Sequence, residues 1–265
     1  KLTLVRDRPL VMMVLRKSFD QGLVTLACKA GAIFLEKRTV IDVSVRQRDV
    51  LVMLQDGETI EAQAVIGCDG MRSVVAEKTN LCKKLESLCI SLVQEHPLTP
   101  KQLDTLYTKK RLVHLFIKAQ GVAGYGWVFP KKHCVNVGIG EFQSALSRSK
   151  QKASLKETYE SFIAMLKTQH LLPGDFPIQE LKGATLPIFP LENTFRDRVL
   201  LCGDAAGFIN PITGEGIYYA MASGQIAASV IAEALKEKNL SRHFLSRYQK
   251  AWNKDFGKDL KILGR

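Results

Sequence analysis

The chain has 265 residues, of which 46% are hydrophobic and 24% charged, an ordinary globular composition that excludes disordered and fibrous proteins. Lys and Arg (38) outnumber Asp and Glu (26), which gives a formal net charge of +12 at pH 7. This charge leaves three kinds of partner open: nucleic acid, an anionic membrane surface and a phosphorylated ligand.

The first third of the chain predicts alternating strands and helices with a β-meander, the pattern of an α/β fold. Ser18 is expected to cap a helix that ends near residue 29, and Asp56-Gly57 is a strong hairpin turn. A short apolar strand then leads into Cys68-Asp69-Gly70. The expected strands cover residues 11–15, 32–35, 39–47, 50–55, 59–61 and 64–67.

The middle of the chain has the pattern of an antiparallel sheet with one amphipathic helix, at residues 153–167. Its expected strands cover residues 88–93, 112–118, 125–129 and 134–139. The α/β pattern then returns, with a strand at 198–202, a long helix ending near 238 and a last helix at 240–262. We therefore expect a discontinuous domain formed by residues 1–82 and 191–265, with a second domain, 83–190, inserted into it.

The most informative stretch is the glycine-rich run from Gly203 to Ile217. A strand that ends in Gly203-Asp204 places a carboxylate where ligand hydroxyl groups could donate to it, and Gly207 allows close approach to the backbone. Pro211 breaks the chain, and Gly214-Glu215-Gly216 opens a long helix whose first N–H groups suit an anion or a carbonyl-rich ring. A plain βα turn explains a single Gly-Asp pair, but the whole run favours a ligand site.

Asp69-Gly70 follows an earlier strand and also precedes a helix. Arg72 and Ser73 could face phosphate, and Asp69 could orient a neighbouring backbone or hydroxyl group. Alone, such a pair is usually a turn. Together with Gly203-Asp204, it predicts two crossovers that converge on one extended cofactor.

These segments resemble the FAD-dependent geranylgeranyl reductase family, in the wider group of aromatic-hydroxylase-like flavoproteins. The resemblance rests on RKSFDQGL at residues 16–23, on Asp69-Gly70 and on the run from Gly203 to Gly216. The most discriminating segment is GYGWVFP at residues 124–130, which is similar to the Y-x-W-x-F-P signature of isoprenoid reductases. The fold implied is α/β (mixed α+β): a partial Rossmann-like FAD-binding domain with an inserted antiparallel-sheet substrate domain.

The resemblance implies a role for each matching residue. Arg16 would contact the ribityl or phosphate region of FAD, Asp204 would bind the ribityl–pyrophosphate portion, and Gly214 to Ile217 would lie against the isoalloxazine ring. Tyr125, Trp127, Phe129 and Pro130 would bind substrate in an apolar slot, with Tyr125 the nearest candidate for a proton donor. Spacing alone instead puts the three aromatic rings on one strand face, packed into a core. The implied cofactor-binding residues are Arg16, Asp69, Gly70, Gly203, Asp204, Gly207, Pro211, Gly214, Glu215, Gly216 and Ile217.

The implied activity is FAD-dependent reduction of C=C bonds in an isoprenoid chain, with an electron donor such as NADPH or ferredoxin. The alternatives are an FAD-dependent aromatic-ring monooxygenase or halogenase on the same scaffold, and a non-catalytic basic binding module. Nucleic acid is not expected, because the basic residues do not cluster with stacking aromatics. The family's opening G-x-G-x-x-G unit is absent, so we expect a fragment that binds FAD weakly or not at all and is inactive alone.

The six cysteines include no C-x-x-C pair, so no metal site is expected, and scattered thiols suit a reducing cytoplasm. Cys202 is expected to be a small core residue rather than a redox thiol, and Lys131-Lys132 a solvated turn. The uncharged run between Glu215 and Glu233 predicts a buried helix. The last helix either packs against the body or contacts a membrane surface, with its aromatic and aliphatic face at Phe244, Tyr248, Trp252, Phe256 and Leu260.

Overall fold

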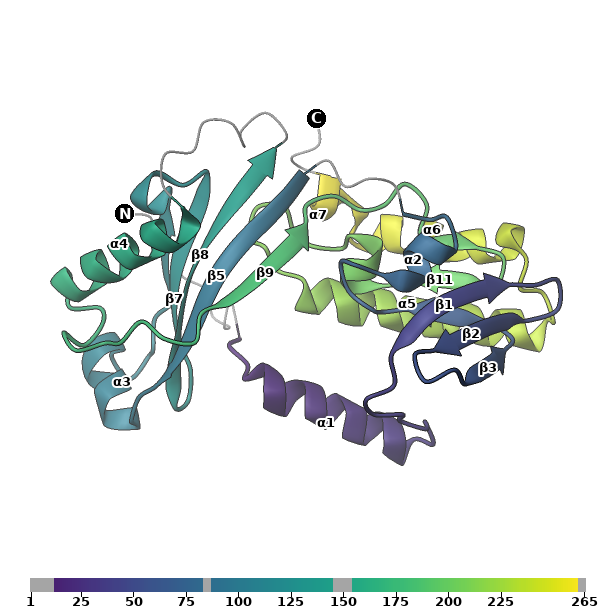
Figure 1. The fold of residues 1–265 in the computed structure, drawn as a ribbon, viewed down its shortest axis with the longest axis horizontal. Helices are drawn as coiled ribbons and strands as arrows, with labels where there is room; N and C mark the ends of the chain where they lie inside the picture. The colour runs from purple at the N-terminus through teal and green to yellow at the C-terminus, as the bar shows by residue number, and fades with distance from the viewer. Residues whose placement is uncertain (1–11, 83–86, 145–153, 262–265) are drawn as a thin grey trace. The chain divides into compact units, whose positions relative to one another are not determined.

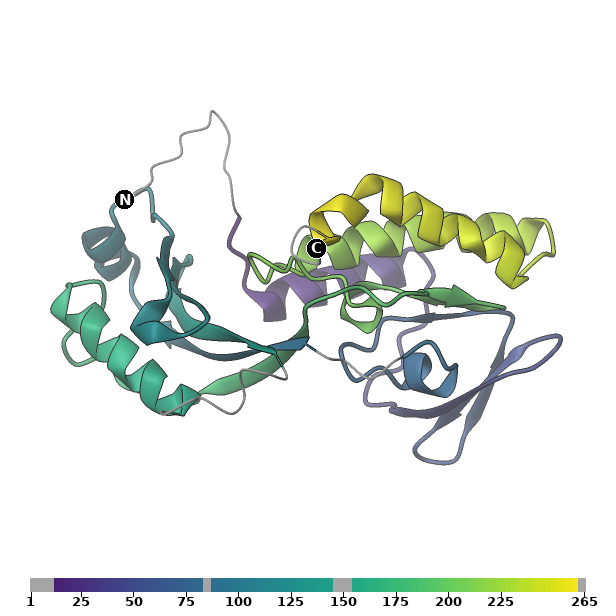
Figure 2. The ribbon, with the colours of Figure 1, turned by 90° about the horizontal axis from the view of Figure 1, so that it is seen from above.

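A computed structural model of the chain describes residues 12–82, 87–144 and 154–261 (Figures 1 and 2). Its helices and mixed sheets confirm the predicted α/β class with an antiparallel sheet. The chain divides into two compact units. Unit 1 comprises Lys1–Glu36, Ser91–Glu141 and Gln151–Ala184, and unit 2 comprises Lys37–Ile90, Phe142–Lys150 and Thr185–Arg265. The domain limits at 82/83 and 190/191 stay a prediction.

A five-stranded sheet of order β6-β7-β8-β5-β9 forms the framework of unit 1. Helix α4 begins with a capping box, in which Ser154 and Glu157 satisfy each other's backbone N–H groups. The elements are α1 (Arg16–Lys29), β5 (Ser87–Pro97), α3 (Pro100–Tyr107), β6 (His114–Ile117), η1 (Ala119–Gly121), β7 (Gly124–Pro130), β8 (Cys134–Ser144), α4 (Leu155–Thr168) and β9 (Lys182–Pro187).

The two faces of this sheet differ because side chains alternate along each strand. On β7, Gly126 and Val128 are buried, and Phe162 of α4 fills the space beside Gly126, where a Cβ atom would lie 2.5 Å from Phe162 Cζ. The residues between them, including Trp127, lie on the opposite face and are half-buried. Helix α4 therefore covers one face of the sheet, and the aromatic residues of β7 lie on the other.

Unit 2 contains an antiparallel meander, β1-β2-β3, and a second sheet of order β10-β11-β4. In this second sheet β11 runs antiparallel to β10 and parallel to β4. The elements are β1 (Val40–Val45), β2 (Val50–Leu54), β3 (Thr59–Ala62), β4 (Val65–Gly67), α2 (Val74–Lys78), β10 (Phe195–Arg196), β11 (Val199–Leu201), η2 (Gly203–Ala206), α5 (Ile217–Lys236), α6 (Arg242–Asp255) and α7 (Gly257–Lys261).

The aromatic face of the last helices lies in the core of unit 2. The side chains are buried, and Trp252 Nε1 donates a hydrogen bond to Thr194 Oγ1 at 2.9 Å. Packing against the body is therefore confirmed, and this face is not open to a membrane. In the described ranges 12–82, 87–144 and 154–261, no helix is both long and apolar enough to cross a bilayer. The buried residues are Phe244, Tyr248, Trp252, Phe256 and Leu260.

Two predicted strands are wrong. Residues 12–15 and 32–35 are not in strands, and Ile33 and Phe34 are 87% and 56% exposed. An apolar run forms a strand only where a neighbouring strand takes its hydrogen bonds, and no strand among the described residues pairs with either run. The first helix begins at Arg16 rather than after Ser18.

The elements that were not expected from the sequence include α3, β9, β10 and the short 3-10 helices η1 and η2. Helix α3 does carry a readable signal, because Thr99 and Gln102 form a capping box around Pro100 at the first helical position. Strands as short as β10 carry too few residues for a periodic pattern.

Candidate functional site

The two predicted carboxylate motifs follow neighbouring parallel strands. Gly67, the last residue of β4, lies opposite Leu201, the last residue of β11, and the N–H of Cys202 donates to the Gly67 carbonyl at 2.9 Å. Because parallel strands end at the same edge of a sheet, the loops that carry Asp69 and Asp204 leave that edge side by side. The two loops are therefore neighbours, whereas their convergence on one cofactor stays a prediction.

The Asp204 carboxylate lies beside the start of the long helix α5. A Cβ atom on Gly216, the N-cap residue of α5, would lie 3.3 Å from Asp204 Oδ1. Because the N-cap residue is a glycine, it has no side chain of its own to accept hydrogen bonds from the first-turn N–H groups of the helix. The Asp204 carboxylate and the backbone N–H groups at the positive end of the helix dipole therefore lie close together. Such a surface suits a polar ligand, because hydroxyl groups can donate to the carboxylate and carbonyl groups can accept from the N–H groups.

Asn210 organises the loop that connects the two parts of this site. Its Oδ1 accepts hydrogen bonds from the N–H groups of Ile212 and Thr213, at 2.9 and 3.0 Å, and its Nδ2 donates to Tyr219 Oη at 3.1 Å. Gly214 has φ +67°, a conformation that favours glycine, and its N–H donates to the Asn210 carbonyl. Burial raises the pKa of Tyr219, although the Asn210 bond opposes the change. The loop is thus preorganised by a residue whose role the sequence analysis missed, and the Asn-Pro pair was its signal.

The protein's own packing already requires glycine at two of the predicted cofactor positions. Gly207 has φ +76°, and a Cβ atom there would lie 2.3 Å from the Phe189 carbonyl oxygen. Gly203 has φ +55°, and its Cβ atom would lie 3.0 Å from the side chain of Ala220. Close packing of the turn against its neighbours explains both residues without a ligand, so their contact with FAD stays a prediction.

Asp69 holds the turn that starts α2. One carboxylate oxygen accepts from the Ser73 hydroxyl at 2.6 Å and the other from the Val75 N–H at 3.1 Å. Ser73 in turn accepts from the Ala76 N–H, as the N-cap of α2. Gly70 has φ +81°, and a Cβ atom there would meet nothing within 4 Å. The expected orienting role of Asp69 is seen, whereas a contact of Asp69 or Gly70 with cofactor stays a prediction.

Arg16 is the first residue of α1 and is exposed. Its guanidinium forms an ion pair with Asp20, one helical turn later, at 2.9 Å. Arg16 belongs to unit 1, whereas Asp69 and Asp204 belong to unit 2. Its proposed contact with the cofactor therefore stays a prediction.

The residues predicted to bind substrate form an aromatic strip, defined as Tyr125, Trp127 and Phe129 on β7. Neighbouring ring centroids are 5.7 and 5.9 Å apart, and the Trp127 and Phe129 rings lie within 28° of parallel. Trp127 lies across Gly138 of β8, where a Cβ atom would lie 2.0 Å from Trp127 Cζ2. The strip is half-buried on the sheet face opposite α4. Its apolar surface suits a hydrophobic ligand, and Pro130 ends the strand.

A polar network fixes the middle ring of the strip. Trp127 Nε1 donates to Asn136 Oδ1 at 2.8 Å, Asn136 Nδ2 donates to Glu95 Oε1 at 3.2 Å, and Lys131 Nζ donates to the same carboxylate. Burial raises the pKa of Glu95, but Lys131 and Asn136 outweigh it, and the pKa lies below its ordinary value. Lys131 was expected to be a solvated turn residue, yet its side chain is 9% exposed. The sequence offered no signal for this pairing, because Glu95 lies on β5 and Lys131 lies 36 residues later, in the turn after β7.

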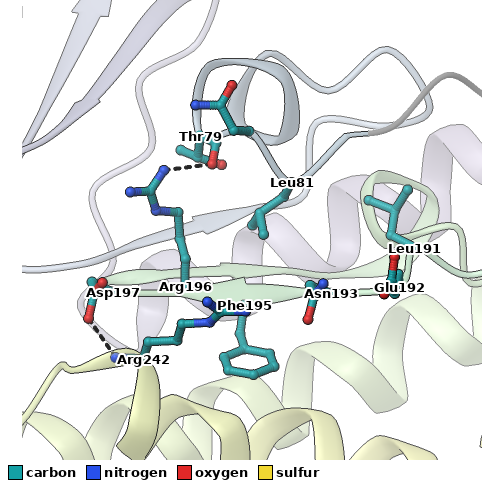
Figure 3. A pocket seen from close by; sticks show the side chains of 10 residues that line it. Thr79, Leu81, Leu191, Glu192, Asn193, Phe195, Arg196, Asp197 and Arg242 are labelled. Atoms are coloured by element: carbon teal, nitrogen blue, oxygen red, sulfur yellow. Dashed lines mark hydrogen bonds between the residues drawn. The ribbon is translucent and has the colours of Figure 1, made fainter.

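A separate cavity of about 250 Å³ lies in unit 2 beside β10 (Figure 3). Arg196 Nη1 donates to the Thr79 carbonyl at 2.6 Å, and the Arg242 N–H donates to Asp197 Oδ1 at 2.6 Å. None of the residues predicted to bind cofactor or substrate lines it. Its lining is Thr79, Asn80, Leu81, Leu191, Glu192, Asn193, Phe195, Arg196, Asp197 and Arg242.

Two curated archaeal proteins are similar to most of this chain. Digeranylgeranylglycerophospholipid reductase of Methanocaldococcus jannaschii is 34% identical over 256 residues, which cover 95% of this chain and 63% of the relative. Digeranylgeranylglycerophospholipid reductase 1 of Methanopyrus kandleri is 32% identical over 250 residues, covering 91% and 63%. The chain thus spans less than two thirds of the length of these relatives.

Solved structures and a family of domains match the same region. A geranylgeranyl bacteriochlorophyll reductase-like protein from Thermoplasma acidophilum has a TM-score of 0.77 and 25% identity, covering 92% of this chain and 60% of that protein. CmlS, a flavin-dependent halogenase, has a TM-score of 0.69 and 21% identity, covering 90% of this chain and 44% of the CmlS chain. At this identity the similarity shows a shared fold alone. The family described as "FAD binding domain" matches residues 11–253. With nearly its whole length matched, the chain belongs to the FAD-binding domain family.

Proposed function

We propose that this chain is part of an FAD-dependent oxidoreductase that reduces C=C bonds of an isoprenoid chain. The observation that carries the proposal is the pair of loops bearing Asp69 and Asp204, which leave adjacent parallel strands, with Asp204 beside the N-cap glycine of α5. The substrate class rests on the two relatives named digeranylgeranylglycerophospholipid reductase and on the aromatic strip.

The residues at this edge fit FAD. Asp204 would accept hydrogen bonds from hydroxyl groups of the ribityl–pyrophosphate portion, and the backbone of Gly214 to Ile217 would donate to carbonyl groups of the isoalloxazine ring. Asp69 and Gly70 would border the cofactor from the neighbouring loop, and Arg16 would contact its ribityl or phosphate region. Gly203, Gly207 and Pro211 shape the turn that brings Asp204 to α5. When bound, the flavin supplies hydride to the alkene.

The aromatic strip and Pro130 would hold the isoprenoid chain and exclude water from it. Tyr125 is the candidate for the group that supplies the proton. NADPH or ferredoxin would supply the electrons, and peripheral contact with a membrane would give access to a lipid substrate. The exposed Lys and Arg residues of α6, rather than its buried aromatic face, would make that contact.

The test uses the purified whole protein of which this chain is part, titrated with FAD and then reduced without oxygen in the presence of a geranylgeranyl glycerolipid in detergent. We expect the lipid to gain two hydrogen atoms per reduced bond, measured by mass spectrometry. Asp204→Asn should lower FAD affinity on the order of tenfold, because a carboxylate acceptor is lost. Asp255→Asn, on the exposed side of α6, is the matched control and should change nothing.

Two outcomes would contradict the proposal. One is equal FAD affinity in wild-type protein and folded Asp204→Asn. The other is a flavin-loaded protein that leaves the lipid unchanged but halogenates or hydroxylates a phenol when oxygen and halide are added, which would place the chain with the ring-modifying flavoproteins.

A further inference from the structure

Two cysteine thiols face each other where β4 and β11 end. Cys68 directly follows β4, and Cys202 directly follows β11. The strands are parallel, with Gly67 opposite Leu201, and the Cys202 N–H continues the ladder by donating to the Gly67 carbonyl. Residues in register on adjacent strands project to the same side of a sheet. The two sulfur atoms are therefore neighbours, although 133 residues separate them in the sequence.

The two thiols have different surroundings. Cys68 is exposed, whereas Cys202 is 2% exposed, with its Sγ 3.3 Å from Tyr248 Oη and 3.6 Å from the Ser223 carbonyl oxygen. Hydrogen bonding with the Cys202 thiol lowers the pKa of Cys68, although burial and Asp69 oppose the change. The same interaction, together with burial, raises the pKa of Cys202. Cys68 is thus accessible to small molecules and forms a thiolate more readily than Cys202, which is the buried thiol of the pair.

We propose that Cys68 and Cys202 are a reversible dithiol–disulfide pair, in which Cys68 attacks and Cys202 resolves. Adjacent strands lie about 4.8 Å apart, within the range of about 4.4 to 6.8 Å between the Cα atoms of a disulfide. The sequence predicts that Cys202 is a small core residue, and its burial agrees with this prediction. The sequence does not indicate that the sulfur atom of Cys68 lies beside it.

The oxidant is a low-molecular-weight disulfide. The Cys68 thiolate attacks one of its sulfur atoms, which forms a mixed disulfide at Cys68 and releases one small thiolate. Cys202 then loses its proton and attacks the Cys68 sulfur, which forms the Cys68–Cys202 bond and releases the second small thiol. The protein loses two electrons and two protons, and the small disulfide gains them. Once Cys68 is in the mixed disulfide it no longer exists as a thiolate, so the main cause of the raised Cys202 pKa is removed.

Oxidation would join the ends of β4 and β11 covalently and fix the spacing of the Asp69 and Asp204 loops. An effect on FAD affinity rests on the function proposed above, whereas formation of the bond does not. The disulfide and the proposed function are therefore tested separately. The disulfide is measured on protein without flavin, and FAD affinity is then compared between the oxidised and reduced forms.

The experiment treats purified protein with one equivalent of oxidised glutathione and identifies disulfide-linked peptides by mass spectrometry without reduction. We expect a Cys68–Cys202 peptide that dithiothreitol removes. Cys202→Ser should instead accumulate glutathione on Cys68, and Cys68→Ser should leave Cys202 unmodified. Cys28→Ser, which alters an exposed cysteine on α1, is the control and should still form the bond.

Limiting iodoacetamide gives a second readout on the wild-type protein, independent of whether the variants fold. We expect carbamidomethylation of Cys68 before Cys202, and loss of the disulfide in the alkylated fraction. The proposal is overturned if folded wild-type protein forms no Cys68–Cys202 peptide, or if Cys202 is alkylated first.

Discussion

The indole N–H of Trp127 donates a hydrogen bond to Asn136 Oδ1 across two antiparallel strands, at 2.8 Å. Asn136 is in turn held by Glu95, which is paired with Lys131. The central ring of the aromatic strip is therefore oriented by a polar network as well as by the space over Gly138.

Replacing Asn136 by Ala should release the Trp127 ring. The indole N–H loses its partner on a half-buried face, so we expect a loss of about 1 kcal/mol in the free energy of unfolding. Acrylamide should also quench the tryptophan fluorescence more strongly, because the second tryptophan, Trp252, is 2% exposed and contributes little to quenching. Unchanged quenching in a folded variant would mean that packing over Gly138 alone holds the ring.

The lowered pKa of Glu95 predicts how the free energy of unfolding depends on pH. Its pKa in the folded protein lies below the ordinary value of 4.5, so its contribution is present above pH 4.5 and is lost as pH falls through the folded pKa. Glu95→Gln removes the pairing with Lys131. Because the Glu95 side chain is 45% exposed, we expect a loss on the order of 1 kcal/mol at pH 7 and a smaller loss at pH 3.

Urea denaturation at the two pH values measures this difference. Glu160→Gln, an exposed carboxylate on α4, is the matched control and should alter stability equally at both. A difference between Glu95→Gln and wild type that grows towards acid pH would contradict the assignment.

The sequence was sufficient where an element is long or carries a specific residue pattern. The Gly203–Ile217 run predicted the turn and α5, and the alternation along residues 125–129 predicted which rings share a face. It was insufficient where the outcome depends on a partner elsewhere in the chain. Ile33 and Phe34 look like strand residues but have no strand beside them among the described residues. The Glu95–Lys131 pair likewise exists only because the fold brings β5 close to the turn that follows β7, which no local pattern encodes.

The two aspartates of the site illustrate the same limit. Both follow a short strand, and the sequence assigned both to the cofactor. In the structure the Asp69 carboxylate makes two hydrogen bonds to the first turn of its own helix, whereas Asp204 lies against the N-cap of α5. The local sequence identified both loops. Only the folded chain shows that Asp69 stabilises the start of its own helix, whereas Asp204 lies beside the start of α5.

Gly207 provides a test of whether a glycine of the site serves folding. A Cβ atom would meet the Phe189 carbonyl oxygen at 2.3 Å, and φ is +76°, so Gly207→Ala should destabilise the flavin-free protein by about 1 to 3 kcal/mol. Gly224→Ala in α5 is the control, because a Cβ atom there meets nothing within 4 Å, and it should be neutral or stabilising. Thermal unfolding without FAD measures both. Equal melting temperatures would mean that the turn can relax and that its glycine is needed for the ligand alone.

Thr194 tests the core that supports the Asp204 loop. It is fully buried, and its hydroxyl oxygen accepts the Trp252 indole N–H at 2.9 Å. Thr194→Val keeps the shape but leaves that N–H buried without a partner, so we expect a loss of about 1 to 3 kcal/mol in the free energy of unfolding. Thr105→Val on the exposed side of α3 also removes a hydroxyl, but water replaces its hydrogen bond, and the change should stay within about 0.5 kcal/mol. Thr194 directly precedes β10, and its carbonyl accepts a hydrogen bond from the N–H of Leu201 at the end of β11. The Thr194→Val substitution should therefore also lower the local stability of β11, the strand that leads to Asp204. Hydrogen exchange at Leu201 and Cys202 measures this, and protection that matches wild type would separate the Trp252 core from the site.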